Sequence, residues 1–397
     1  MSVGTAFHPR TAPLNRKMQW REWSGYLASS VYADYHDIEY NAIREAAALI
    51  DVSPLYKYEV SGHDALRLVD RVITRDATRI RVGGVVYTPW CDESGKVIDD
   101  GTVHRLAEDR FRWTTADPQL RWLRQNARGL DVAIEDTSER TAAVALQGPL
   151  SRAVLEAATA ESFADLRYFR RRGSRIGKIA IDVSRTGYTG DLGYELWMDA
   201  GDAVAVWDRL VEAGRPFGIR PAGMVALDVV RLEAGLILLE VDYTSARHAL
   251  NSEQAYSPAE IGLGRLVDLD KEPFVGQRAL RAEARAGGPA RRLVGLSIDW
   301  SGIEALHAAQ DLPPLAPASV SRSPVPVFDG AGHRIGRATS TGWSPILKKP
   351  IALASVPPAF EAPGSRLGIE WTVEGRRGLV AATVVALPFL DLERKRA

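Results

Sequence analysis

The sequence predicts an α+β protein with two mixed units of helices and strands, followed by an all-β unit. The chain has 397 residues, of which 46% are hydrophobic, so it is too long for one ordinary core. Helical and strand-like patterns alternate, and the same order of elements recurs along the chain. After Leu280 the pattern changes to short strands separated by turn residues, which is typical of an all-β unit.

The first mixed unit begins with a helix predicted over residues 37–50, where apolar residues have helical spacing and Asp37 is a candidate cap. The other elements follow in order: a strand at 56–62, a helix at 63–72, strands at 83–91 and 102–116, and a helix at 117–130. Helices and strands in this order indicate a small sandwich of helices on an antiparallel sheet.

The same order recurs in a second mixed unit that has no clear sequence similarity to the first. Its elements are a strand at 141–149, a helix at 150–158, strands within 176–190 and at 193–198, and a helix at 202–214. A charged connector with Gly and Pro at 283–292 leads into the all-β part. Strands are expected there within 291–298, 323–340, 350–356 and 378–389.

The charge balance and the cysteine content argue against several classes of protein. Fifty basic residues balance fifty acidic residues, so the charge does not indicate binding to nucleic acid or to a membrane surface. The single cysteine, Cys91, suits a reducing cytoplasm. There is neither a signal peptide core nor a run of about 18 apolar residues, and the seven histidines include no close pair with metal-ligand spacing. We therefore expect a cytoplasmic protein without a bound metal.

Residues 97–106, VIDDGTVHRL, place two adjacent carboxylates where a strand is expected to start. Aspartate is a poor strand former and is common in turns, so the simplest interpretation is a hairpin turn. The alternative is that one carboxylate faces a functional site. Adjacent residues of a strand point to opposite faces, so only one of Asp99 and Asp100 can do so.

Five ordered motifs resemble those of one protein family. They are VALQGP at 144–149, SRTGYTGDLGYELWM at 184–198, RPAGMVALDVVRLEAG at 220–235, GLGRLVDLDKEPFVGQRAL at 262–280 and STGWSPILKKPIALASV at 340–356. In order and spacing they resemble the glycine cleavage T-protein (aminomethyltransferase) superfamily of tetrahydrofolate-dependent one-carbon transferases and demethylases. The similarity runs from about residue 20 to residue 389.

The resemblance implies a three-domain cloverleaf around a central channel that holds tetrahydrofolate. The first α+β domain, which binds folate, is expected at 1–50 and 142–280, and the second, which carries the Asp-Asp pair, at 51–141. Both are expected to be ferredoxin-like. The C-terminal domain, at 281–397, is expected to be a β-barrel or jelly roll.

By its position in the family motif, the resemblance implies that Asp100 is the carboxylate beside the reactive nitrogens of the folate. A carboxylate there stabilises developing positive charge and fixes the orientation of the pterin. Glu195 resembles the family's pterin anchor, because a buried carboxylate suits the two adjacent N–H donors of the aminopyrimidine edge.

Further folate contacts follow from the same resemblance. Tyr87, Tyr168 and Tyr188 match tyrosines of the folate channel, although each taken singly is more often a core residue. Arg231 matches an arginine that can pair with the carboxylates of the folate. Thr115 stands where the family has an asparagine near the folate.

The sequence departs from T-proteins at positions that concern the second substrate. Pro54 and Leu55 replace a polar pair, and Leu227 replaces an arginine. The segment 241–261 is longer than in T-proteins and supplies Tyr243. Insertions near a channel mouth are common sites of changed specificity. We therefore expect a pocket for a free small molecule in place of a lipoyl arm.

These observations predict an enzyme that moves a methyl group from a small O-, N- or S-methylated substrate to tetrahydrofolate. Asp100 and Tyr243 are the expected catalytic residues, with Tyr243 as a candidate proton donor to the leaving atom. An ordinary loop tyrosine is the simpler interpretation of Tyr243. The alternatives are a glycine cleavage aminomethyltransferase, which takes an aminomethylated substrate on a lipoyl carrier protein, and a noncatalytic folate-binding regulator.

Overall fold

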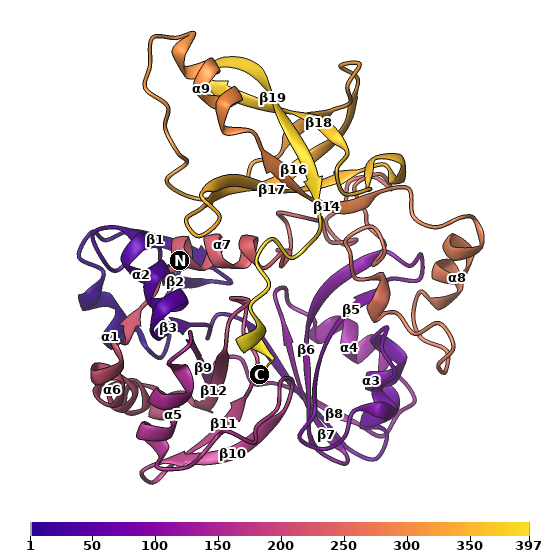
Figure 1. Ribbon diagram of the computed structural model, residues 1–397. Coiled ribbons are helices and arrows are strands. Elements are labelled where there is room, and N and C mark those ends of the chain that lie inside the picture. The colour runs from indigo at the N-terminus through magenta and orange to yellow at the C-terminus, as the bar shows by residue number, and fades with distance from the viewer. Residues whose placement is uncertain (1, 397) are drawn as a thin grey trace.

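The strands form two open sheets, a closed barrel and a short hairpin within residues 2–396, which the computed structural model describes. Figure 1 shows the barrel above the two sheets, which stand side by side, and the C-terminal segment returning from the barrel to the centre of the molecule. The predicted α+β fold with a C-terminal barrel is therefore confirmed.

The first sheet has the strand order β10-β11-β12-β9-β3-β13 and is antiparallel except where β13 joins β3. Its strands are β3 (Ala48–Asp51), β9 (Thr141–Gln147), β10 (Arg171–Ile176), β11 (Ile179–Ser184), β12 (Gly193–Asp199) and β13 (Arg220–Pro221). The helices of this part are α2 (His36–Glu45), α5 (Ser151–Thr159), α6 (Ala203–Gly214) and α7 (Met224–Glu233). Leu146 and Leu196 pack with α5 and α6 on one face, whereas Ala145 and Trp197 face the centre of the molecule.

The second sheet has the strand order β5-β6-β7-β4-β8 and is antiparallel throughout. Its elements are β4 (Tyr56–Ser61), α3 (Ala65–Val72), β5 (Val85–Cys91), β6 (Val97–Ala107), β7 (Arg110–Thr115), α4 (Leu120–Asn126) and β8 (Ala133–Asp136). Residues of α3 and α4 pack with Val103, Phe111 and Trp113 in one buried cluster. The side chains on the other face of β6 and β7 point toward the centre of the molecule.

The barrel closes in the order β14-β17-β16-β15-β18-β19, with β19 paired to β14. Its elements are β14 (Arg292–Ile298), α9 (Trp300–Ala308), β15 (Val325–Phe328), β16 (Arg334–Ser344), β17 (Lys349–Val356), β18 (Arg366–Val373) and β19 (Arg376–Val385). The smaller elements outside it are α1 (His8–Thr11), the hairpin of β1 (Trp20–Trp23) and β2 (Tyr26–Ser29), and α8 (Gln277–Arg285). The exact ends of the three predicted domains stay a prediction.

The structure corrects one local prediction and decides between two interpretations of the Asp-Asp pair. The helix predicted over 37–50 ends at Glu45, and residues 48–51 form β3, in which Ile50 pairs with Ala145. A short apolar run fits a helix and a buried strand equally well, and here the neighbouring strand decides between them. The Asp-Asp pair lies inside β6 rather than in a turn, because Asp99 and Asp100 pair with Trp90 and Pro89 of β5.

One hydrophobic core is shared by all three parts. It combines Ile50 of the first sheet, Val97 of the second sheet and Leu353 of the barrel with Tyr243 and Tyr256 from segment 241–261. Because one core joins the three parts, the side chains near it are held in fixed relative positions.

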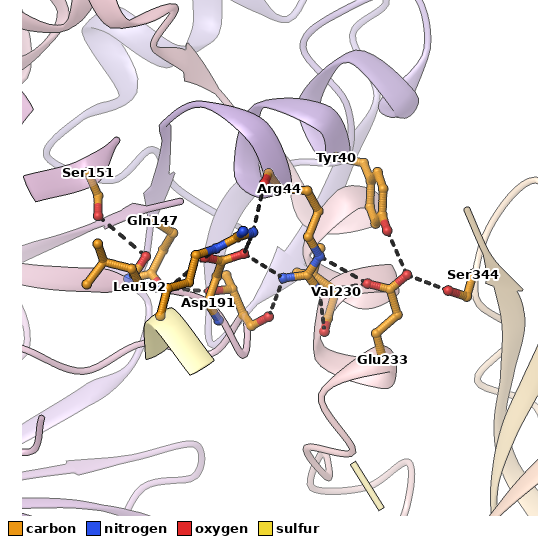
Figure 2. A network of polar contacts seen from close by, with 11 residues as sticks. Tyr40, Arg44, Gln147, Ser151, Asp191, Leu192, Val230, Glu233 and Ser344 are labelled. Carbon is orange, nitrogen blue, oxygen red and sulfur yellow. Dashed lines mark hydrogen bonds and ion pairs between the residues drawn. The ribbon is translucent and has the colours of Figure 1, made fainter. Parts of the chain in front are cut away.

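A buried polar network ties α2 to the barrel (Figure 2). Arg44 donates through Nη2 to Glu233 at 2.7 Å, and through Nη1 to Asp191 at 3.3 Å. Tyr40 donates to Glu233 at 2.7 Å, and Ser344 of the barrel donates to it at 2.6 Å. The side chains of Asp191 and Glu233 are both fully buried, so one guanidinium faces two carboxylates.

The C-terminal segment supplies the second cation. Arg394 donates to Asp191 through Nε at 2.7 Å and through Nη2 at 2.9 Å. It also donates to the main-chain carbonyl oxygen of Arg44 at 2.8 Å. The two buried carboxylates are thus balanced by two guanidinium groups, one of which comes from the far end of the chain.

Replacing Arg394 with methionine is expected to lower the free energy of unfolding by about 1 to 3 kcal/mol, because a buried carboxylate loses its charged donors. Thermal unfolding measures this loss. The matched control is Arg396→Met, which breaks a pair with the half-exposed Asp391 and should change stability by less than about 0.5 kcal/mol. Equal unfolding temperatures for the two variants would contradict the role given to Arg394.

Candidate active site

The two adjacent aspartates of β6 have different roles in the structure. Asp99 is fully buried and accepts hydrogen bonds from the amide of Asp100 at 2.7 Å, the amide of Asp117 at 3.0 Å and Nε2 of Gln119 at 3.2 Å. These contacts hold the chain that follows β7. Position 101, after Asp100, requires a glycine, because a Cβ there would lie 2.0 Å from the carbonyl oxygen of Thr114. Asp99 is therefore a structural residue.

Asp100 faces the centre of the molecule and is held by two tyrosines. Tyr87 of β5 donates its hydroxyl to Oδ2 of Asp100 at 2.6 Å, and Tyr243 donates its hydroxyl to Oδ1. The two phenols approach from different parts of the chain and occupy both carboxylate oxygens. Three of the predicted site residues, Asp100, Tyr87 and Tyr243, are thus in direct contact.

Segment 241–261 carries Tyr243 to this position by docking on the start of β6. Ala246 donates its amide to the carbonyl oxygen of Val97 at 2.8 Å, and Val97 donates its own amide to Tyr256 at 2.7 Å. Ser245 donates its hydroxyl to the carbonyl oxygen of Ile98 at 2.6 Å. The strand that carries Asp100 and the segment that carries Tyr243 are therefore one assembly.

The environment of Asp100 favours its protonated form more than water does. Burial raises the pKa of Asp100, and the hydrogen bonds from Tyr243 and Tyr87 lower it in part. Burial and the neighbouring Asp100 charge raise the pKa of both phenols well above its usual value. Both hydroxyls therefore stay protonated and act as donors to the carboxylate.

Tyr188 and Arg231 lie near this cluster but make other contacts. The hydroxyl of Tyr188 donates to the carbonyl oxygen of Ile237. Arg231 is buried and donates to Asp242 at 2.8 Å and to the hydroxyl of Ser340 in the barrel at 3.0 Å. Asp242, which the sequence analysis did not single out, thus takes up the charge of Arg231. This pairing favours a structural role for Arg231, in place of the predicted pairing with the ligand.

Glu195 lies on β12 of the first sheet. Thr186 donates its hydroxyl to Oε2 of Glu195. Burial raises the pKa of Glu195, whereas the Thr186 hydroxyl and the positive charge of Arg112 lower it. The carboxylate keeps unused acceptor capacity, because a carboxylate has about four acceptor positions.

The two remaining predicted residues make contacts with other groups. Thr115 is buried at the end of β7 and donates its hydroxyl to the carbonyl oxygen of Asp117 at 2.6 Å. Tyr168 is half-buried, and Lys395 of the C-terminal segment lies 5.7 Å from the centre of its ring. Burial raises the pKa of Tyr168 to about 12. The structure does not place either side chain in contact with the Asp100 cluster.

A cavity of about 560 Å³ lies elsewhere, between α1 and α6, and is lined by Arg10, Trp207 and Asp208 among others. None of the predicted site residues lines it, and two of its charged groups, Arg10 and Asp208, bind each other at 2.7 Å. Across residues 2–396 there is no group of three or more side chains suited to bind a metal. Within the same residues, no helix is both long and apolar enough to cross a membrane.

Comparison with known proteins gives consistent matches. Residues 6–271 match the GCVT N-terminal domain, and residues 291–391 match the glycine cleavage T-protein C-terminal barrel domain. An aminomethyltransferase from Halalkalibacterium halodurans is 36% identical, with 88% of each chain covered. The crystal structure of the glycine cleavage system aminomethyltransferase T from Bartonella henselae superposes with a TM-score of 0.82, at 25% identity, and covers 98% of this chain and 99% of that one.

A trimethylamine-oxide aldolase from Ruegeria pomeroyi is 37% identical over the whole of this chain. The match covers 48% of that protein, so the chain spans about half the length of this relative.

Removing either phenol is expected to raise the pKa of Asp100 further, because each hydroxyl favours the ionised carboxylate. In Tyr87→Phe and Tyr243→Phe the midpoint of the Asp100 titration should move to higher pH by about one unit, the equivalent of one charge-assisted hydrogen bond. Carbon NMR of labelled aspartate measures this midpoint. Tyr188→Phe is the control, since its hydroxyl binds a carbonyl oxygen, and a shift there as large as in the other two would contradict the assignment.

Proposed function

Because this chain belongs to the glycine cleavage T-protein (aminomethyltransferase) family, we propose that it is a tetrahydrofolate-dependent transferase that takes a methyl group from a small O-, N- or S-methylated substrate. The observation that carries the proposal is the carboxylate of Asp100, which two tyrosine hydroxyls hold at the centre of the molecule. Within residues 2–396 no cation contacts this carboxylate, and the nearby Asp242 is itself paired with Arg231. A site of this charge favours a reaction in which positive charge develops.

The residues present fit tetrahydrofolate. Glu195 is a half-buried carboxylate that has a single hydroxyl donor within the described chain and keeps acceptor positions for the adjacent N–H groups of a pterin. Tyr87 and Tyr188 pack against the shared core beside Asp100 and offer flat apolar faces. When bound, tetrahydrofolate supplies a ring nitrogen that accepts the one-carbon group. Glu195 and Asp100 would hold it from the two sheets.

Asp100 would act by charge and by orientation. Its carboxylate stabilises positive charge on the group being transferred, and its two hydrogen bonds keep it from rotating as that charge develops. The hydroxyl proton of Tyr243 is directed at Asp100, and the phenol is a weaker acid than usual because its pKa is raised. We therefore propose that Tyr243 chiefly orients the carboxylate. Its role as the proton donor stays a prediction.

The substrate proposal depends on the residues around segment 241–261. Leu227 is buried in the shared core, where an arginine of a T-protein would need a partner. Pro54 and Leu55 replace polar side chains in the turn between β3 and β4. These changes favour a small free substrate. The alternative is an aminomethyltransferase that works with a lipoyl carrier protein, and the 36% identity to an aminomethyltransferase supports the transferase part of this alternative.

A product assay separates these possibilities. The protein is incubated with tetrahydrofolate and a panel of O-, N- and S-methylated compounds, trimethylamine oxide and an aminomethyl donor, and the folate products are identified by mass spectrometry. We expect 5-methyltetrahydrofolate from one class of methylated compound. Formation of 5,10-methylenetetrahydrofolate with ammonia from the aminomethyl donor alone would contradict methyl transfer and support the alternative. Folate binding without any product would favour a regulator.

The two aspartates provide a matched pair of variants. Asp100→Asn should still bind tetrahydrofolate, but turnover should fall by a factor on the order of 10² or more, because the charge is lost while the shape is kept. Asp99→Asn presents an amide to three hydrogen-bond donors, so we expect a lower unfolding temperature and a much smaller loss of turnover in the folded fraction. Similar losses of turnover in both variants would refute the role proposed for Asp100.

A further inference from the structure

The cavity between α1 and α6 lies on the outer side of the first sheet, and Figure 1 shows these two helices at the edge of the molecule, away from β6. Its volume of about 560 Å³ is within the range of small-molecule binding sites. Most of the side chains that line it are apolar, among them Pro13, Leu14, Trp207, Val211 and Ile219. The cavity can therefore hold the apolar part of a small molecule.

The two helices that enclose the cavity are held together by packing and by charge. Phe7, which precedes α1, is fully buried, and its ring centre lies 5.7 Å from that of Trp207 on α6. Arg10 of α1 donates to both carboxylate oxygens of Asp208, through Nε at 2.7 Å and through Nη2 at 2.8 Å. The cavity is thus formed before any ligand binds, which lowers the entropic cost of binding.

Two arginines that line the cavity have no partner. Glu212, which also lines it, accepts a hydrogen bond from Arg209 at 2.8 Å. Arg215 and Arg220 are exposed, and neither makes an ion pair or a side-chain hydrogen bond in the part of the chain that the structure describes. A guanidinium group can donate two parallel hydrogen bonds to one carboxylate. These two side chains are therefore available to bind an anion.

A tight turn places both arginines at the same cavity. Gly218, at φ 68°, donates its amide to the carbonyl oxygen of Arg215 at 3.2 Å. Arg220 begins β13, and its amide donates to the carbonyl oxygen of Ala47 at 3.1 Å. The main chain is thus held in place at both positions, so the two guanidinium groups are kept near one opening of the protein surface.

We propose that this cavity binds a small organic anion that consists of an aliphatic body and a carboxylate head group. The body would lie against Leu14, Val211 and Ile219, and the head group would accept hydrogen bonds from Arg215 and Arg220. None of the residues proposed to bind tetrahydrofolate lines the cavity, so this inference does not depend on the proposed function.

The charges at the cavity favour a carboxylate over a phosphate head group. Asp208 and Glu212 line the cavity together with the arginines. A phosphate monoester carries nearly two negative charges at neutral pH, whereas a carboxylate carries one. The two acidic side chains therefore repel a phosphate more strongly than a carboxylate.

Octanoate is a suitable probe, because it joins one carboxylate to an aliphatic chain. Octanol keeps the chain without the charge, and acetate keeps the charge without the chain. Calorimetry on the full chain should give a Kd for octanoate below about 1 mM, and binding of octanol and acetate that is about tenfold weaker or more. Equal affinities for octanoate and octanol, or tighter binding of octyl phosphate than of octanoate, would overturn the proposal.

Substitution of the two arginines tests the head-group contacts. Both side chains are exposed, so Arg215→Gln and Arg220→Gln should fold normally. Each should weaken octanoate binding by about three- to tenfold and leave octanol binding unchanged. Arg366→Gln is the matched control, because Arg366 is an exposed arginine of the barrel. Unchanged octanoate binding in the double variant, or an equal loss in Arg366→Gln, would overturn the proposal.

Nitrogen NMR of the unaltered protein, labelled at tryptophan, locates the bound probe. The indole N–H signal of Trp207, assigned by its absence in Trp207→Phe, should move when octanoate is added, because Trp207 lines the cavity. Trp371 of β18 is the internal control, and its signal should stay in place. A Trp207 signal that does not move at saturating octanoate would show that the probe binds elsewhere, and the proposal would fail.

Discussion

A carboxylate that is removed from water must be given hydrogen-bond donors, and the arrangement of this protein's centre follows from that constraint. Asp99, Asp191, Glu233 and Asp242 are all buried where parts of the chain meet. Their donors come from distant segments, so satisfying them brings those segments together. Arg44 illustrates this point, because it joins the loop that contains Asp191 to helix α7 and, through Glu233, to the barrel.

The carboxylates at the centre of the molecule differ in their donors. Asp191, Glu233 and Asp242 each contact a guanidinium group, so their charge is balanced within the protein. Asp100 and Glu195 are half-buried, and within residues 2–396 their side chains accept hydrogen bonds from hydroxyl groups alone. A buried carboxylate without a cation in contact retains a negative potential, which a ligand with N–H donors or developing positive charge can use. The proposed site therefore consists of two half-buried carboxylates that are contacted by hydroxyl groups, whereas the fully buried Asp99 is satisfied by amide donors of the chain.

Segment 241–261 connects this site to the question of the substrate. It docks on the first residues of β6 through main-chain hydrogen bonds, and it places Tyr243 on Asp100. Tyr256 of the same segment is buried and accepts a hydrogen bond from Arg337 of the barrel, so the segment is anchored on two sides. A change of specificity within the family could thus be made by a segment that leaves the two sheets intact.

The sequence by itself determined the family, the α+β order, the C-terminal barrel and the fact that Asp99 and Asp100 face opposite ways. These features depend on local periodicity or on motifs of contiguous residues, both of which can be read along the chain. The tertiary structure alone decided that residues 48–51 are a strand, because the neighbouring strand β9 was needed to distinguish it from a helix. It also decided that Arg231 is paired with Asp242, that Tyr243 binds Asp100 across 143 residues, and that Arg394 balances Asp191 across 203 residues. The physical reason is that a buried charged side chain needs a hydrogen-bonding or charged partner, and its role depends on which partner it has. Tertiary packing, and not the neighbouring sequence, determines that partner.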